Sequence, residues 1–154
     1  MKPQIALNIK KVTSSAFTQC AQLRHKLWPQ DTVDAHLADI TALYQEHPYC
    51  AFIAYESDEP IGFVEASMKP YVNGCLYRPV GFIEGLWIAP SHQHQESDHY
   101  IAKSLIAPCA RWAKENGAQE LASDAYLENT LSHQAHREWG FDMTEKVVYF
   151  RKTL

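Results

Sequence analysis

Three acidic residues lie where apolar segments end or are interrupted, and a carboxylate there is costly to bury unless it is paired or faces a wet cleft. Glu84 interrupts an apolar run next to Gly85, Asp124 directly follows a short predicted strand, and Glu145 precedes the last apolar run. If these acids converge, they form a negative pocket that attracts a polyamine or an amino sugar and supplies a general base. The alternative is three separate, solvated acids.

The segment around Glu84 is the most informative part of the chain. Residues 81–89 are almost entirely apolar and end at Pro90, which predicts a central strand buried on both faces. A glycine inside a strand, here Gly85, often marks a bulge or a close approach by a ligand. The combination predicts a strand that opens onto a polar site. The alternative is an edge strand whose Glu84 faces water.

Aromatic and histidine side chains are further candidates for binding a ligand or a metal. Trp28 and Tyr71 stand beside turns, where they either stack on a sugar or a cation or serve as ordinary core aromatics. His92, His94 and His99 form a histidine-rich run, but no Cys/His spacing has the form of a metal site. We therefore expect no metal.

Composition describes an ordinary globular protein. The chain has 154 residues, 46% hydrophobic and 21% charged, with a formal net charge of −4, so one domain over residues 1–154 is the simplest expectation. The negative charge argues against nucleic acid, and no apolar run is long enough to cross a bilayer. The N-terminus lacks the apolar core of a signal peptide, and the four cysteines are widely spaced. We expect reduced thiols in a cytoplasmic protein.

Hydrophobic periodicity and capping residues predict the secondary structure. The predicted elements are a strand at 5–12, helices at 16–27 (capped by Ser14 or Ser15) and 33–46, strands at 50–55, 61–67 and 81–89, a helix capped by Ser97 or Asp98 and ended by Gly117, a strand at 120–123, a helix from 128 to Gly140, and a last strand at 147–151. Hairpins in the middle and strand-helix-strand units near the end favour a mixed sheet in an α+β or α/β domain.

Several segments in this order resemble the GNAT acyltransferase superfamily, and within it the bacterial aminoglycoside 6′-N-acetyltransferases. The similar segments, which span nearly the whole chain, are Leu27-Trp28-Pro29, Asp34-Ala35-His36-Leu37-Ala38-Asp39, Tyr71-Val72-Asn73-Gly74-Cys75, Phe82-Ile83-Glu84-Gly85, Ala122-Ser123-Asp124 with Glu128-Asn129-Thr130, and Gly140-Phe141 leading to Thr144-Glu145-Lys146-Val147-Val148. Any one motif is weak, but the set is specific.

The resemblance implies a mostly antiparallel central sheet with a splayed parallel strand pair, flanked by helices, and acetyl-CoA bound in the splay. It implies that the backbone of the central strand pairs with the pantetheine arm as an added strand would. The implied cofactor-binding residues are Leu86, Trp87, Ile88, Ile101, Ala102 and Asn129.

The resemblance also implies the substrate and the chemistry. An aminoglycoside antibiotic would bind to Trp28, Asp31, Tyr71, Glu84, Asp124 and Glu145. Its 6′-ammonium group must lose a proton before it attacks the thioester, with Glu84 or Asp124 as the implied catalytic base. Antibiotic resistance and a homodimer, as in the relatives, follow from the same resemblance.

One segment departs from the family pattern. The family places a glycine-rich loop after the central strand, where backbone N–H groups at a helix N-terminus bind the pyrophosphate. Here residues 91–101 carry an insertion, Tyr100 stands where a glycine is expected, and Glu96 and Asp98 would repel phosphates. This leaves two alternatives: a protein that binds cationic aminoglycosides without acetylating them, or an acetyltransferase for another amine such as a polyamine or a protein N-terminus.

Overall fold

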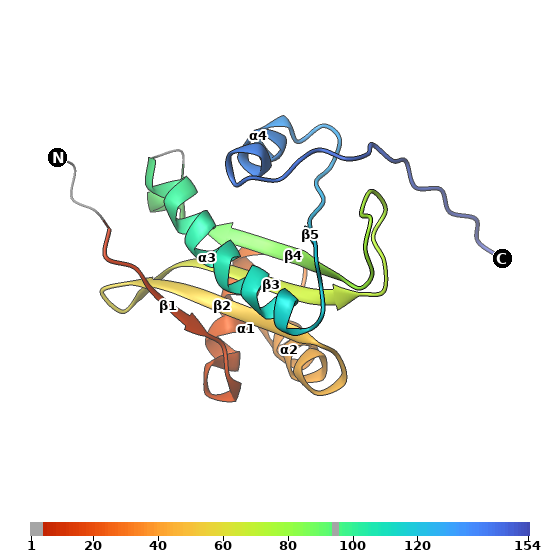
Figure 1. The fold of residues 1–154 in the computed structure, drawn as a ribbon. Helices are drawn as coiled ribbons and strands as arrows, with labels where there is room; N and C mark the ends of the chain where they lie inside the picture. Colours follow the sequence, from red (N-terminus) through yellow and green to blue (C-terminus); the bar gives the residue numbers. More distant parts are fainter. Residues whose placement is uncertain (1–4, 94–95) are drawn as a thin grey trace.

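The strands form one mixed sheet. The structure is a computed structural model that describes residues 5–93 and 96–154. Its strands are β1 (Asn8–Lys11), β2 (Tyr49–Glu56), β3 (Glu59–Lys69), β4 (Val80–Ile88) and β5 (Leu121–Ala122), in the spatial order β1-β2-β3-β4-β5. The first three pairings are antiparallel and β4 pairs with β5 in parallel (Figure 1). The predicted mixed sheet with a late parallel pair is confirmed.

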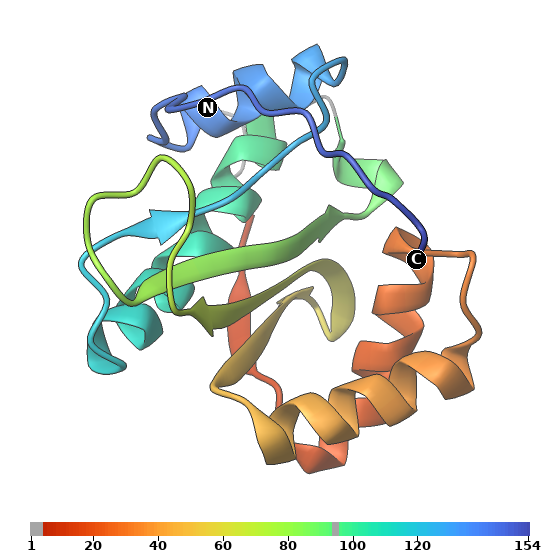
Figure 2. The ribbon, with the colours of Figure 1, turned by 90° about the vertical axis from the view of Figure 1, so that its right-hand side faces the viewer.

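Helices cover both faces of this sheet. α1 (Phe17–Leu27) and α2 (Val33–Glu46) lie on one face, and α3 (Glu96–Glu115) crosses the other (Figures 1 and 2). Along α3 the predicted apolar stripe is confirmed, because Ile101, Leu105, Cys109 and Trp112 are all buried. No helix in residues 5–93 or 96–154 is long and apolar enough to cross a membrane.

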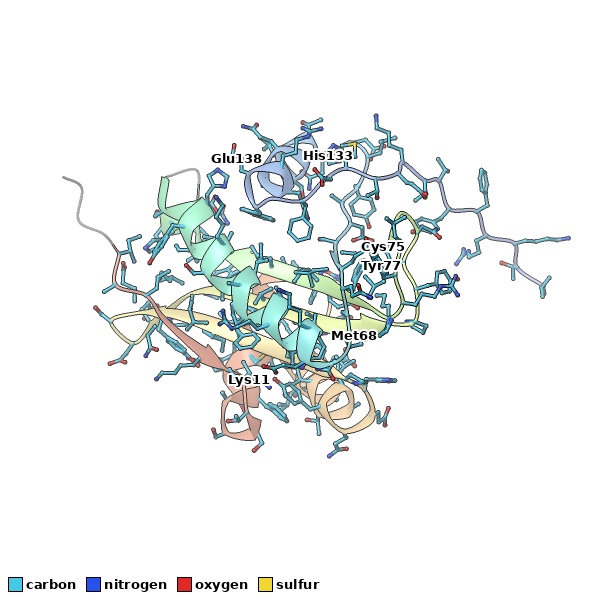
Figure 3. All side chains as sticks on the ribbon, in the orientation of Figure 1. Lys11, Met68, Cys75, Tyr77, His133 and Glu138 are labelled. Carbon is cyan, nitrogen blue, oxygen red and sulfur yellow. The ribbon has the colours of Figure 1, made fainter. Side chains whose placement is uncertain are left out.

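The last helix, α4 (Thr130–Glu138), follows β5. The Asn129 side chain accepts a hydrogen bond from the Ser132 N–H and caps the helix. His99 Nε2 on α3 lies 2.6 Å from Glu138 Oε2 on α4, so this contact joins the two helices. Figure 3 shows Glu138 on α4. Gly140 follows with φ +94°, the left-handed geometry that ends helices. The sequence predicted both ends of this helix.

Two of the predicted helix caps are wrong. Ser14 and Ser15 lie within a short 3₁₀ helix, η1 (Ser14–Ala16), and no side chain caps α1. Helix α3 begins at Glu96, so Ser97 and Asp98 lie inside its first turn. Several cap-forming residues stand in a row at each site, and a sequence pattern alone does not say which of them starts the helix.

The predicted strand at 147–151 is also wrong. Residues 141–154 have no regular secondary structure, and Val148, Tyr149 and Phe150 are 72%, 82% and 94% exposed. The segment has strong β-forming residues, but a strand also needs a partner strand for its backbone groups, and none of the described residues provides one. The first strand, predicted at 5–12, is also shorter, because only Asn8–Lys11 pair with β2.

All four cysteines are free in the structure. Cys20, Cys50 and Cys109 are buried and Cys75 is half-buried. Burial raises the pKa of the Cys20 thiol to about 12, and such thiols are poor nucleophiles.

Candidate active site

A β-bulge explains the carboxylate inside the apolar strand. On β3, Glu65 pairs with Gly85 of β4 and Ala66 pairs with Ile83, so Glu84 is an extra residue without a partner in the ladder. The bulge turns Glu84 out of the regular alternation, and its side chain is 32% exposed. The expected bulge is therefore confirmed. The expected burial on both faces fails at Glu84, which is exposed, and at Gly85 and Leu86, which are half-buried.

Gly85 permits a close approach by the end of α1. A Cβ built on Gly85 would lie 2.6 Å from Trp28 Cη2 and 2.7 Å from Leu27 Cδ2, closer than carbon atoms pack. Because these groups touch the strand backbone, Trp28 is held beside the residue that follows Glu84.

We predict that Gly85→Ala lowers the free energy of unfolding by about 1–3 kcal/mol, because the added methyl overpacks the contact with Trp28 and Leu27. Urea unfolding followed by circular dichroism measures this. Leu27→Ala on the Gly85→Ala background should relieve the overpacking, so the double variant should be less destabilised than the sum of the two single changes. Additive effects would contradict the proposed contact.

A cavity of about 560 Å³ opens beside this contact, and three of the predicted substrate residues line it: Trp28, Asp31 and Glu84. Its wall also includes Ser67 and Lys69 of β3. This volume is within the usual range for small-molecule sites. Tyr71, Asp124 and Glu145 are not among the residues that line it.

Glu84 is not a free carboxylate at the cavity wall. The Ser67 hydroxyl donates a hydrogen bond to Glu84 Oε1, and Lys69 Nζ lies 3.3 Å from the same oxygen. Lys69 Nζ also lies 4.4 Å from the centre of the Phe82 ring, within cation–π distance. The carboxylate is therefore held by a hydroxyl and an ammonium group that sequence reasoning did not single out.

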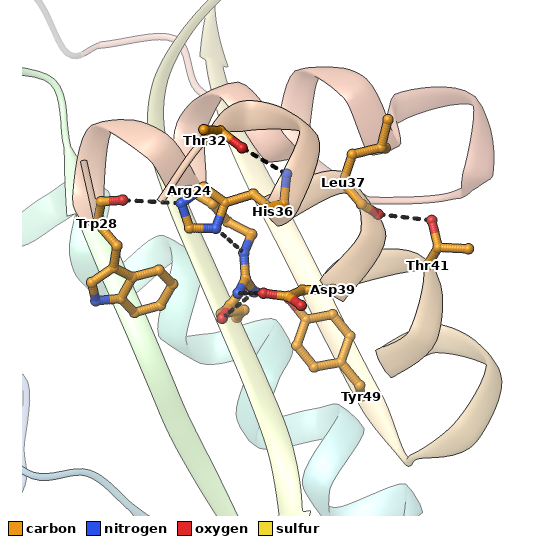
Figure 4. Close-up of polar contacts among 10 residues, drawn as sticks. Arg24, Trp28, Thr32, His36, Leu37, Asp39, Thr41 and Tyr49 are labelled. Atoms are coloured by element: carbon orange, nitrogen blue, oxygen red, sulfur yellow. Dashed lines mark hydrogen bonds and ion pairs between the residues drawn. The ribbon is translucent and has the colours of Figure 1, made fainter. Parts of the chain in front are cut away.

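A buried polar network forms the floor of the cavity (Figure 4). Arg24 Nη1 donates to Glu65 Oε1 at 2.7 Å and to Oε2 at 2.6 Å, and the Tyr49 hydroxyl donates to Oε2. Glu65 is only 2% exposed. Burial raises the pKa of the Glu65 carboxyl, while the charge of Arg24 and the hydrogen bond from Tyr49 act to lower it.

The network continues through His36 to the segment that carries the predicted site residues. Arg24 Nε donates to His36 Nδ1, so Nδ1 carries no hydrogen and Nε2 donates to the Trp28 carbonyl at 3.0 Å (Figure 4). His25 Nδ1 bonds the Asp31 carbonyl at 2.7 Å. These contacts fix the turn between α1 and α2, and with it the cavity side chains of Trp28 and Asp31.

The loop after β3 and the C-terminal segment lie against each other. A Cβ built on Gly74 would lie 3.7 Å from Glu145 Cγ. The same loop is also held by Glu120, which precedes β5: Glu120 Oε1 accepts hydrogen bonds from the N–H groups of Leu76 and Tyr77 at 2.7 Å each. Tyr71 begins this loop and is 61% exposed. Glu145 therefore lies near the Tyr71 loop, and neither of these residues is among those that line the cavity beside Glu84.

Asp124 is exposed at the end of β5, next to a well-held serine. His136 Nδ1 donates to the Ser132 carbonyl at 2.7 Å, and His136 Nε2 forms a hydrogen bond with the Ser123 hydroxyl at 2.8 Å. This link between α4 and β5 positions the backbone at Asp124. The roles of Asp124, Tyr71 and Glu145 remain predictions.

Of the predicted cofactor residues, those on β4 have backbone groups open to a ligand, and those on α3 are buried. β5 pairs with β4 only at Gly81 and Phe82, so among the described residues Leu86, Trp87 and Ile88 have a strand neighbour on the β3 side alone. Their outer backbone groups can pair with an extended ligand. Ile101 and Ala102, by contrast, are fully buried within α3, and the N–H groups that a helix start leaves free lie upstream of them.

Among the described residues, no group of three or more His, Cys, Asp or Glu side chains is arranged to hold a metal ion. His92 pairs with Glu56, and His99 pairs with Glu138. His94 lies outside the described residues.

Sequence reasoning missed the buried pair and the lysine. Glu65 interrupts the apolar strand 61–67 in the way that Glu84 interrupts the next strand, and Arg24 stands one residue after Leu23 on the buried side of α1. A carboxylate and a guanidinium at core positions signal an ion pair. Lys69 carries no comparable signal, because a lysine at a strand end is ordinarily solvated.

The chain is similar to known proteins over nearly its full length. A model of the Acetyltransferase (GNAT) family matches residues 16–141. Aminoglycoside N(6')-acetyltransferase type 1 of Salmonella enteritidis is 39% identical over 147 residues, covering 95% of this chain and 99% of that protein. The enzyme of the same description from Acinetobacter haemolyticus is 39% identical over 149 residues, covering 96% and 99%.

Solved structures agree with this likeness. AAC(6')-Iy in complex with the bisubstrate analog CoA-S-monomethyl-acetylneamine superposes with a TM-score of 0.88 at 38% identity, covering 97% of this chain and 99% of that one. AAC(6')-Iy in complex with CoA has a TM-score of 0.89 at 37% identity, covering 100% and 99%.

Proposed function

The chain belongs to the acetyltransferase (GNAT) family, and from this premise we propose that it transfers the acetyl group of acetyl-CoA to the 6′-amine of aminoglycoside antibiotics. The observation that carries the proposal is the likeness over nearly the whole length to aminoglycoside N(6')-acetyltransferases. The cavity lined by Trp28, Asp31 and Glu84 supports it, because an aromatic face beside acids suits a polycationic amino sugar.

In the proposed arrangement, acetyl-CoA lies along the outer edge of β4 beyond the point where β5 leaves it. The backbone of Leu86, Trp87 and Ile88 pairs with the pantetheine arm as a further strand would. The diverging end of β5 supports this position, because β5 pairs with β4 only as far as Phe82. Asn129, the cap of α4, lies on the cofactor side.

The proposed chemistry begins with deprotonation. The 6′-ammonium group gives a proton to Glu84 or Asp124, directly or through water, and the freed lone pair attacks the thioester carbonyl carbon. A C–N bond forms, and a backbone N–H of β4 stabilises the oxyanion. The nitrogen gives up its second proton as the C–S bond breaks, and the departing CoA thiolate takes up one proton, directly or through water. Glu84 fits the role of base because it is partly exposed at the cavity wall.

The decisive assay is acetylation of kanamycin or tobramycin by the purified protein with acetyl-CoA, followed by release of the CoA thiol and by mass spectrometry of the product. We expect one acetyl group on the 6′-nitrogen. No turnover would reject the proposal. Calorimetry then identifies the alternative: drug binding without acetyl-CoA binding indicates a non-catalytic binder, and acetyl-CoA binding without drug binding indicates an acetyltransferase for another amine.

We also propose a homodimer formed through the C-terminal segment. Val147, Val148, Tyr149 and Phe150 combine strong β propensity with large exposed apolar surface, an unfavourable state for an isolated chain. A second copy of the chain would supply the missing strand partner. Sedimentation equilibrium should give twice the chain mass of 17.6 kDa, and Val148→Asp should shift the protein towards the monomer. A wild-type monomer would contradict the proposal.

A further inference from the structure

The two cationic side chains that line the cavity, Arg24 and Lys69, have different carboxylate partners. Arg24 faces the buried Glu65 at 2.6 Å and lies 4.0 Å from Asp39, so its charge is already balanced within the floor network. Lys69 is different, because its ammonium group reaches over the Phe82 ring to Glu84, the carboxylate at the cavity wall.

Lys69 satisfies Glu84 in the way that an amine substrate would. Its Nζ is a primary ammonium group 3.3 Å from Glu84 Oε1, and Phe82 supplies an aromatic face 4.4 Å away. A carboxylate and an aromatic ring are the groups that recognise a cationic amine. A lysine side chain carries this charge on a long, flexible stem, which can swing aside without disturbing the backbone.

We infer that Lys69 occupies Glu84 as an internal competitor of the substrate and must be displaced from it before the substrate's ammonium group binds there. This inference rests on the proposed function, and it makes Lys69 a residue that sets affinity for amines. The exposure of the two side chains, 39% for Lys69 and 32% for Glu84, allows this exchange, because a pair this open to water is weak. The Ser67 hydroxyl keeps the carboxylate in place while the lysine leaves.

The alternative roles of Lys69 make different predictions. If Lys69 oriented Glu84, its loss would lower kcat, and if it bound a phosphate of CoA, its loss would raise the KM for acetyl-CoA. If it only served the stability of the strand end, its loss would leave both kinetic constants unchanged.

The test is steady-state kinetics of Lys69→Met with kanamycin and acetyl-CoA as substrates. Methionine keeps the stem and removes the charge. We expect the KM for kanamycin to fall about three- to fivefold, with kcat within about twofold of the wild type and the KM for acetyl-CoA unchanged. Lys11→Met is the matched control, because it changes net charge equally on exposed β1, which β2 and β3 separate from β4 (Figure 3). Lys11→Met should leave the KM for kanamycin as it is.

An unchanged or higher KM for kanamycin in Lys69→Met would overturn the inference, as would an equal fall in the Lys11→Met control. Lys69→Arg gives a second check. A guanidinium can grip the carboxylate through two hydrogen bonds, so this variant should hold Glu84 at least as tightly and keep or raise the KM.

Calorimetry of kanamycin binding, without turnover, separates this inference from the proposed function. The gain in affinity from Lys69→Met should disappear when both proteins also carry Glu84→Gln, because the competition is for that carboxylate. A gain that persists in the Glu84→Gln background overturns the inference.

If the wild type binds kanamycin but does not acetylate it, the proposed function fails while this cycle still decides the role of Lys69. If the wild type acetylates kanamycin normally and Lys69→Met binds it no better, the inference alone fails, and no binding to the wild type contradicts both.

Discussion

Replacing Glu65 with leucine should lower the free energy of unfolding by about 3–5 kcal/mol, because it leaves the Arg24 guanidinium buried without its counter-ion. Arg24 is 7% exposed and Glu65 is 2% exposed, so little water reaches the guanidinium group to replace the lost carboxylate. The change also removes the acceptor of the Tyr49 hydroxyl, and an unpaired buried hydroxyl adds to the loss.

The informative comparison removes all three polar side chains that meet at the Glu65 carboxylate. The triple variant Arg24→Met, Tyr49→Phe, Glu65→Leu replaces each member with an apolar side chain of similar volume, and such replacements of buried ion pairs are often neutral or stabilising. We expect the triple variant to be more stable than Glu65→Leu alone in urea unfolding. If the single variant lost less than about 1 kcal/mol, the pair would not be desolvated as the structure indicates.

The triple variant also tests what the network does for the cavity. Arg24 donates to His36, and His36 holds the Trp28 carbonyl. Without that link the turn between α1 and α2 loses an anchor. We therefore expect a folded triple variant with a raised KM for the aminoglycoside.

Glu84→Gln should lower kcat/KM for the aminoglycoside by about a hundredfold or more, because the amide can neither accept the proton of the 6′-ammonium group nor balance its charge. Glutamine keeps the length of the side chain, and its amide oxygen can still accept the Ser67 hydrogen bond, so the fold should not change. The measurement is steady-state kinetics at saturating acetyl-CoA.

Two companion variants interpret that result. Asp124→Asn should reduce turnover if Asp124 acts on the substrate, and unchanged kinetics would reject its role and leave Glu84 as the base. Glu59→Gln changes net charge equally at the exposed start of β3, and it should leave kcat/KM within about twofold of the wild type. A Glu84→Gln enzyme as active as Glu59→Gln would exclude Glu84 as the base.

Features that depend on neighbours in the chain were predictable. The bounds of α2, Val33–Glu46, follow from its apolar periodicity between Thr32 and Pro48. The bulge at Glu84 follows from a carboxylate beside a glycine in an apolar strand. Such signals are local, because helix periodicity, caps and strand glycines act over a few residues.

The groups that meet across the chain were not predictable in this way. Arg24 and Glu65 are 41 residues apart in sequence, and their contact exists only because α1 packs on the sheet. The C-terminal segment shows the opposite failure, since 147–151 has strand-forming residues but lacks a partner among the described residues. Strand formation depends on that partner as much as on propensity.

The sequence by itself determined the order of the elements from β1 to α4, the mixed sheet and the bulged strand that carries Glu84, because local propensity and periodicity specify these. Only the tertiary structure decided that Trp28, Asp31 and Glu84 share one cavity and that Lys69 reaches the carboxylate. These groups come from the turn after α1 and from two different strands, so their distances depend on how the helices pack on the sheet, which no short stretch of sequence specifies.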